Sequence, residues 1–180
     1  LNKDKKLVVI VMGSLGSTTM TEKLKQLIPA FNNKNYQVII ITGKKYYDSY
    51  KNISIPKNVA LLPFLDNLIG LLKSTDLLVS RAGASTIAEI TAIGLPSILV
   101  PSPYVTNNHQ YKNAKELEEL GAVELIEEDN FSYASIIPRI DAILENKVLY
   151  NKMKESSLKL GVRDSATRIY QEIKKIVKDD

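Results

Sequence analysis

The sequence of 180 residues contains no cysteine and a single histidine, His109. The absence of cysteine excludes disulfides, thiolate metal sites and cysteine nucleophiles, and it is typical of proteins from a reducing compartment. One histidine cannot supply the paired ligands of a histidine metal site. No apolar run approaches the roughly 20 residues that cross a bilayer, and the chain shows no signal-peptide pattern. We therefore expect a cytoplasmic protein without a metal site.

An excess of basic charge is also largely missing. Lys and Arg number 24 against 20 Asp and Glu, which gives a formal net charge of +4. The lysines are scattered, with short clusters only near both ends, so the sequence predicts no nucleic-acid-binding surface. Apolar residues make up 44% of the chain, enough for the core of one domain of this length.

Short apolar runs recur along the first two thirds of the chain, each with the length of a strand that is buried on both faces. They predict strands at residues 7–12, 37–42, 59–62, 76–80, 97–100 and 122–126. Helical spacing between them predicts helices at 19–32, 65–74, 86–93 and 108–120, and three more follow at 132–144, 147–160 and 165–178, the last with Asp164 as its cap. Alternation of strand and helix predicts a parallel sheet covered on both faces. We expect one α/β domain over residues 1–180, with a Rossmann-like three-layer α/β/α fold.

The loop after the first predicted strand reads GSLGS, at residues 13–17. Ligands of open α/β sheets bind beyond the carboxyl ends of the strands, and glycine-rich backbone beside a helix N-terminus suits phosphate. A tight strand-to-helix turn uses the same residues. The loop is neither GxGxxG nor a P-loop, and the second strand ends in ITGKK without an acid for a ribose, which argues against a nicotinamide dehydrogenase.

The loop after the fourth predicted strand reads SRAGAS, at residues 80–85, and is followed by a lone acid, Glu89. Thr86 and Glu89 have the T-x-x-E spacing of a capping box, in which Glu89 would bind the start of its own helix. Alternatively, its two carboxylate oxygens could accept hydrogen bonds from a pair of sugar hydroxyls, while nearby amides hold phosphate. The spacing alone leaves both interpretations open.

Polar amides crowd the start of the helix that follows the fifth predicted strand, at Asn107, Asn108, His109, Gln110 and Asn113. Such a cluster suits the recognition of a neutral ligand that is rich in hydroxyls. A histidine at this position is also common on protein surfaces without a function. The sequence shows no Ser/His/Asp order for nucleophilic catalysis.

Together these loops resemble the C-terminal, donor-binding domain of the bilobed GT-B glycosyltransferases, in particular that of the MurG-like N-acetylglucosaminyltransferases of peptidoglycan synthesis. The resemblance rests on four segments in family order: GSLGS at 13–17, SRAGASTIAEITAIGLPSILVP at 80–101, NNHQYKNA at 107–114 and DSATRIYQEI at 164–173. It implies the C-terminal lobe of a GT-B fold and inverting transfer of N-acetylglucosamine from UDP-N-acetylglucosamine to the lipid-linked acceptor lipid I. It implies no cofactor.

The resemblance also implies which residues bind the donor. The diphosphate would meet two loops, represented by Ser14, Leu15 and Gly16 in the first and by the amides of Ala84, Ser85 and Thr86 in the second. Leu15 stands where glutamine is frequent in the family, a change that backbone contacts tolerate.

The nucleoside and the sugar would meet three further places in the chain. Glu89 would take the ribose hydroxyls, and the main chain at Leu65, after LLPF, would pair with uracil. His109, Gln110 and Asn113 would face the amino sugar. His109 departs from the family pattern, in which glutamine often holds this position.

MurG-like enzymes also have an N-terminal lobe, which holds the lipid acceptor and the catalytic base, and no segment of this sequence corresponds to it. We therefore expect the chain to be the second half of a longer enzyme that binds a nucleotide sugar, acts at the cytoplasmic face of the plasma membrane and carries its base on the other lobe. Two alternatives stay open. One is a transferase that makes glycosyl diacylglycerols, and the other is a natural single-lobe donor-binding subunit.

Overall fold

The computed structural model describes residues 1–12 and 18–178 of the chain. Six strands form a sheet in the order β3-β2-β1-β4-β5-β6, and every neighbouring pair is parallel. The strands are β1 (Lys6–Val11), β2 (Tyr36–Ile41), β3 (Val59–Leu62), β4 (Leu77–Ser80), β5 (Ser97–Leu99) and β6 (Val123–Leu125). The predicted parallel sheet is confirmed, and each strand lies within one or two residues of its predicted ends.

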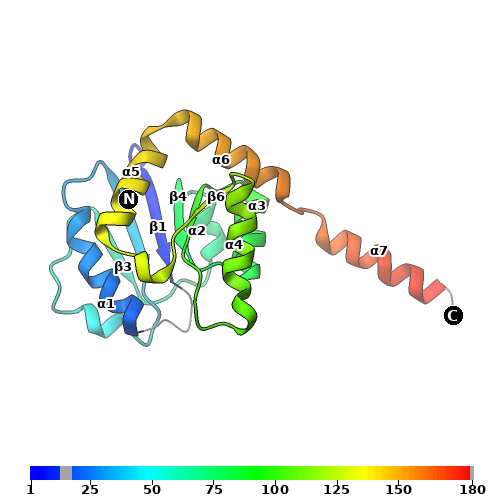
Figure 1. Ribbon diagram of the computed structural model, residues 1–180, viewed down its shortest axis with the longest axis horizontal. Coiled ribbons are helices and arrows are strands. Elements are labelled where there is room, and N and C mark those ends of the chain that lie inside the picture. The colour runs from blue at the N-terminus through cyan, green and yellow to red at the C-terminus, as the bar shows by residue number, and fades with distance from the viewer. Residues whose placement is uncertain (13–17, 179–180) are drawn as a thin grey trace.

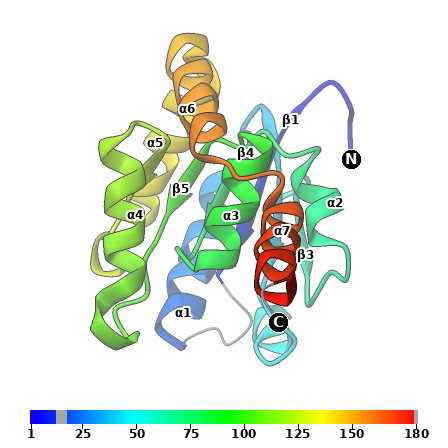
Figure 2. The ribbon, with the colours of Figure 1, turned by 90° about the vertical axis from the view of Figure 1, so that its right-hand side faces the viewer.

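Helices cover both faces of the sheet, as Figure 1 and Figure 2 show. The α-helices are α1 (Thr18–Leu27), α2 (Leu68–Leu72), α3 (Ala84–Ile93), α4 (His109–Glu119), α5 (Tyr133–Glu145), α6 (Lys147–Leu160) and α7 (Ser165–Lys178). Short 3-10 turns are η1 (Ile28–Phe31), η2 (Tyr47–Tyr50), η3 (Thr106–Asn108) and η4 (Glu128–Asn130). The three-layer α/β/α architecture predicted from the sequence is therefore confirmed.

Two apolar cores explain why the helices divide between the faces. Alternate residues of a strand point to opposite faces, so Val8 and Ile10 of β1 pack with α1, η1 and α5, while Leu7 and Val9 pack with α2, α3 and α4. Because β1, β2, β4 and β5 are largely buried on both sides, each reads in the sequence as a mainly apolar run.

The carboxyl ends of all six strands meet along one row of the sheet. The row consists of paired residues from neighbouring strands, in the order Leu62, Ile41, Val11, Ser80, Leu99 and Leu125. The loops that follow these residues therefore start side by side at one edge. In this strand order β1 and β4 lie next to each other at the centre, where the direction of winding changes and ligands of such sheets bind.

Several predicted helix boundaries were wrong, each for a local backbone reason. The helix predicted at 19–32 ends at Leu27 and continues as η1, because Pro29 has no N–H and its ring clashes within a regular helix. The helix predicted at 65–74 begins only at Leu68, because the side chain of Asn67 caps it by accepting from the N–H of Gly70 at 2.9 Å.

A smaller difference concerns the helix predicted at 108–120, which begins one residue later, at His109. Asn107 and Asn108 have φ angles of 55° and 52°, so both lie in the left-handed region and interrupt the helical path. Asparagine adopts this region more readily than most residues. The helical last third of the chain was predicted correctly.

Helix α7 stands apart from the sheet and projects from the body of the molecule (Figure 1). Asp164, predicted as its cap, directly precedes it, and a hydrogen bond from Arg168 lowers the pKa of this carboxyl. One side of α7 carries apolar residues that are all more than half exposed: Ile169, Tyr170, Ile173, Ile176 and Val177. Their spacing makes α7 an amphipathic helix whose apolar side is uncovered.

Replacing Gly94 by alanine is expected to destabilise the domain by about 1–3 kcal/mol. Gly94 ends α3 with a φ of 68°, and an added Cβ would overlap the side chain of Leu158 on α6. Urea unfolding measures the change. Gly121→Ala is the matched control, because Gly121 has a similar φ of 69° and a Cβ there meets no atom closer than 3.6 Å. A Gly94→Ala protein as stable as the wild type would contradict this packing of α3 against α6.

Candidate functional site

The N-terminus of α3 lies at the edge where the strands end. The helix begins at Ala84, two residues earlier than predicted, and its cap is Gly83, which has no side chain to offer. The first hydrogen bond of the helix runs from the N–H of Ile87 to the carbonyl of Gly83 at 3.0 Å. In the described part of the chain, the amides of Ala84, Ser85 and Thr86 therefore have no partner. Three unpaired amides at the positive end of a helix dipole form a site for an anion.

Glu89 does not cap its helix. Because Gly83 is the cap, Thr86 and Glu89 both lie inside α3 and the capping-box alternative is wrong. Glu89 is partly buried, and among residues 1–12 and 18–178 its carboxylate makes no hydrogen bond or ion pair. An ionised carboxylate that is partly withdrawn from water without a partner is available to a ligand that donates hydrogen bonds.

Leu65 lies in the loop between β3 and α2, outside any helix. Its side chain packs against the apolar core on the α3 side of the sheet. Its N–H has no hydrogen-bond partner among the described residues, so the packed side chain fixes a main-chain donor that is free. This geometry suits the predicted contact with the edge of a base.

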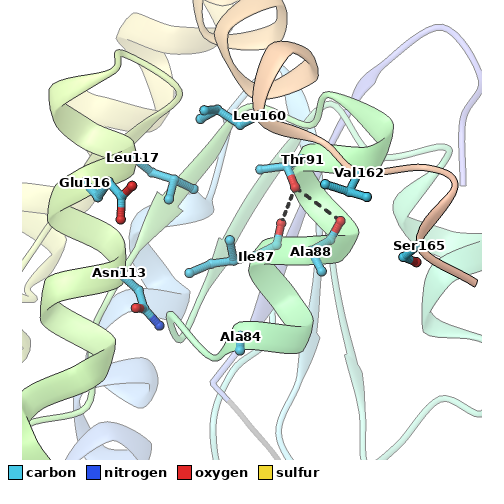
Figure 3. Close-up of a pocket in the computed structure, with 10 residues that line it drawn as sticks. All are labelled: Ala84, Ile87, Ala88, Thr91, Asn113, Glu116, Leu117, Leu160, Val162 and Ser165. Atoms are coloured by element: carbon cyan, nitrogen blue, oxygen red, sulfur yellow. Dashed lines mark hydrogen bonds between the residues drawn. The ribbon is translucent and has the colours of Figure 1, made fainter. Parts of the chain in front are cut away.

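The polar residues at the start of α4 differ in their exposure and in their hydrogen bonds. His109 is exposed, and its Nδ1 lies 2.9 Å from the carbonyl oxygen of Thr106. Gln110 is partly buried, and its Oε1 accepts a hydrogen bond from the N–H of Ser102 at 2.9 Å. Asn113 is partly buried and faces the space between α3 and α4 (Figure 3). Thus Gln110, which is predicted to contact the sugar, also binds the loop after β5.

A groove of about 410 Å³ runs between α3 and α4 up to the segment before α7. Figure 3 shows that Ala84 and Asn113 lie at one end of this groove and Leu160 at the other. Ser85, Thr86, Glu89, His109 and Gln110 do not line it. Of the predicted donor residues, Ala84 and Asn113 therefore line the groove, and these five lie beside it.

The loop with Ser14, Leu15 and Gly16, predicted to contact the diphosphate, lies outside the described residues. The register of the sheet places the end of β1 directly beside the end of β4, because Val11 pairs with Ser80. The chain therefore leaves β1 next to the loop that leads into α3.

Comparison with known protein families identifies the family of this chain. Residues 7–169 match the glycosyltransferase family 28 C-terminal domain. The chain belongs to this family. The match contains the loops after β1, β4 and β5, so the resemblance inferred from the sequence is confirmed.

Two relatives are similar to this family 28 domain along nearly its whole length. The protein from Bacillus cytotoxicus is 42% identical over 182 residues, covering 99% of this chain and 50% of the relative. The protein from Leuconostoc citreum is 42% identical over 177 residues, covering 95% of this chain and 48% of the relative. Both are named UDP-N-acetylglucosamine--N-acetylmuramyl-(pentapeptide) pyrophosphoryl-undecaprenol N-acetylglucosamine transferase. The chain thus spans about half the length of the curated relatives it matches.

The crystal structure of MurG from Acinetobacter baumannii has the same fold as this family 28 domain. It superimposes with a TM-score of 0.80 at 23% sequence identity and covers 97% of this chain and 51% of that one. The predicted fold class, the C-terminal lobe of a GT-B glycosyltransferase, is therefore confirmed.

One feature of the site in this family 28 domain has no signal in the sequence. Arg81, the first residue after β4, forms an ion pair with Glu128 of η4, with 2.6 Å between Nη2 and Oε2. Only 12% of the arginine side chain and 3% of the glutamate side chain are exposed. Oε2 accepts no well-aligned hydrogen bond from the described residues, so the attraction is mainly one of charge. Arg81 lies in a recognised motif, but nothing in the sequence of η4 marks Glu128 as its partner.

Among residues 1–12 and 18–178, no helix has the length and apolar character needed to cross a membrane. The same residues contain no group of three or more histidine, aspartate or glutamate side chains that could hold a metal ion.

Proposed function

We propose that the chain is the donor-binding lobe of an inverting glycosyltransferase. The donor is UDP-N-acetylglucosamine and the acceptor is undecaprenyl-pyrophosphoryl-N-acetylmuramyl-pentapeptide, lipid I. The observation that carries the proposal is that α3 holds both the amides at its start and the carboxylate of Glu89, none of which has a partner among the described residues. A diphosphate needs such amides, and a ribose diol needs such a carboxylate. The names of the relatives supply the sugar and the acceptor.

The same arrangement suits the chemistry of transfer. An acceptor hydroxyl attacks the anomeric carbon and gives its proton to the base of the other lobe, the bond from that carbon to the phosphate oxygen breaks, and UDP leaves with an additional negative charge. Amides aimed at the place where this charge develops, together with the helix dipole, stabilise the transition state more than the ground state. In this proposal Ala84, Ser85 and Thr86 provide that stabilisation, and the reaction uses no cofactor and no metal ion.

The acceptor and the catalytic base belong to the other half of the protein in this proposal. The relatives are about twice as long as this chain, which leaves room for a second lobe facing the donor edge. The uncovered apolar side of α7 supports the existence of further polypeptide to pack against. We place the whole enzyme at the cytoplasmic face of the plasma membrane, where lipid I is held by its undecaprenyl chain.

Competition binding tests the nucleoside specificity of this site. UDP is expected to bind roughly 10-fold more tightly than GDP or dTDP. GDP should bind less tightly because the main chain at Leu65 fits the edge of one pyrimidine. dTDP should bind less tightly because it lacks the 2′-hydroxyl that would donate a hydrogen bond to Glu89. Equal affinities for the three nucleotides would mean that the edge is a general phosphate site.

Comparing UDP-N-acetylglucosamine with UDP-glucose tests the sugar. We expect the N-acetylated donor to bind more tightly to the chain. Preference for UDP-glucose would instead favour a transferase that makes glycosyl diacylglycerols.

A further inference from the structure

Arg81 joins the ends of three strands at the donor edge. It leaves β4 directly, its Nη2 pairs with Glu128 after β6, and its Nη1 donates to the carbonyl oxygens of Val100 and Pro101 after β5, at 3.1 Å and 3.2 Å. A guanidinium group is a rigid planar fork, so its contacts on one side fix the direction of its contacts on the other. The ion pair with Glu128 therefore sets where the Pro101 carbonyl is held.

The peptide unit between Pro101 and Ser102 is held from both sides. Its carbonyl oxygen accepts from Arg81, and its N–H donates to the side chain of Gln110 at 2.9 Å. Because a main-chain N–H can only donate, the Gln110 atom that faces it is the oxygen. The Nε2 group of Gln110 is left as the part that can donate to a ligand.

Glu128 is itself fixed from a second direction. The Nζ of Lys23, on α1, donates to the main-chain carbonyl of Glu128 and to that of Asp129, the latter at 3.2 Å. The segment that pairs with Arg81, at Glu128 and Asp129, is therefore bound to α1 as well as to the sheet.

We propose that Arg81 and Glu128 are positioning residues for the donor sugar. Through the Pro101–Ser102 peptide they hold Gln110 with its oxygen turned inward and its N–H groups turned outward. In this orientation the amide donates to a hydroxyl or N-acetyl oxygen of the sugar. The inference rests on the proposed function, because it assigns a cause to the orientation of one residue at the same donor site.

Stability alone is a weak reason for such a pair. Removing two charges from water costs about as much as their attraction returns, so a buried ion pair is often no more stabilising than two apolar side chains of similar size. An apolar pair, however, has no donor to hold the Pro101 carbonyl. The two effects can therefore be separated by replacing both members together.

The test uses the double variant Arg81→Met/Glu128→Leu, with titration calorimetry of UDP and UDP-N-acetylglucosamine. The measured quantity is the ratio of the two dissociation constants, relative to the same ratio for the wild type. We expect UDP affinity to change less than about 3-fold and the ratio to shift about 3- to 10-fold against the sugar nucleotide. The melting temperature is expected to stay closer to that of the wild type than in either single variant, each of which buries an unpaired charge.

The variant Gln110→Ala tests whether Gln110 acts together with the Arg81–Glu128 pair. In the wild type it should weaken the binding of the sugar nucleotide about 3- to 10-fold, on the order of one neutral hydrogen bond, whereas in the double variant it should add almost nothing. Arg81→Lys is a second variant that keeps the charge beside Glu128. It lacks the fork needed to hold Pro101 as well, and we expect it to shift the ratio in the same direction.

The matched control is Arg139→Met/Glu124→Leu, which removes an ion pair of the same residue types between α5 and β6. This control should leave the ratio unchanged. Equal losses for UDP and UDP-N-acetylglucosamine in the Arg81 variants, or a Gln110→Ala effect that is independent of them, would overturn the positioning role. A wild-type chain that binds neither nucleotide would instead overturn the proposed function itself.

Discussion

Replacing Glu89 by alanine is expected to weaken UDP binding about 10- to 150-fold, because hydrogen bonds to a charged group contribute roughly 1.5–3 kcal/mol. Within residues 1–12 and 18–178 the carboxylate, which lies inside α3, has no partner, so no other described residue depends on it. The free energy of unfolding should therefore change little, since alanine is itself a good helix former. Calorimetric titration and urea unfolding of the same preparation measure both quantities.

The ribose role makes a second demand on the same variant. The wild-type chain should bind 2′-deoxy-UDP poorly, and the Glu89→Ala chain should no longer distinguish it from UDP. Glu119→Ala, an exposed acid on α4, is the control for loss of one negative charge and should leave both affinities unchanged. A folded Glu89→Ala protein with wild-type affinity for UDP would show that this carboxylate does not bind the ribose.

Replacing Gly83 by aspartate is expected to stabilise the fold while abolishing most nucleotide binding. An aspartate at the cap of α3 accepts hydrogen bonds from the amides of Ser85 or Thr86 and favours the helix dipole, which together should raise stability by about 0.5 kcal/mol. The space is open, because a Cβ at this position meets no atom within 4 Å. The same carboxylate occupies the amides that the diphosphate needs and repels its charge.

We expect Gly83→Asp to weaken UDP binding roughly 100-fold, which corresponds to about 2.8 kcal/mol. Gly83→Ser adds a cap without a charge and should give an intermediate loss. Thermal melts and calorimetry on the three proteins test these opposite changes in stability and affinity. Unchanged UDP affinity in Gly83→Asp would mean that the amides of α3 do not hold the phosphates.

The sheet could be predicted from the sequence because strands that are buried on both faces leave an unbroken apolar run. Val8, Val9 and Ile10 in β1 show this directly, since all three are fully buried. The ends of helices depended on local backbone geometry, which the spacing of apolar residues does not predict. The left-handed turns at Asn107 and Asn108 moved the start of α4, and the bare cap at Gly83 moved the start of α3.

The candidate donor residues came only from motifs, whereas the hydrogen bonds and burial of their side chains required the structure. The T-x-x-E spacing allowed a capping box at Glu89 until the cap was found at Gly83. Side-chain contacts between elements were not predicted, since nothing in the local pattern links Arg81 to Glu128 or Ser102 to Gln110. The first pair is set by the order of strands in the sheet, and the second by the path of the chain between β5 and α4.

Amide NMR during a UDP titration tests most directly the claim that uridine diphosphate binds where α3 begins. We predict saturable shifts that are largest for the N–H groups of Ala84, Ser85 and Thr86, with a second set at Leu65. In the Gly83→Asp protein these shifts should require far more UDP. Saturable shifts confined to the groove around Thr91 and Leu117, with those four amides unmoved, would contradict the claim.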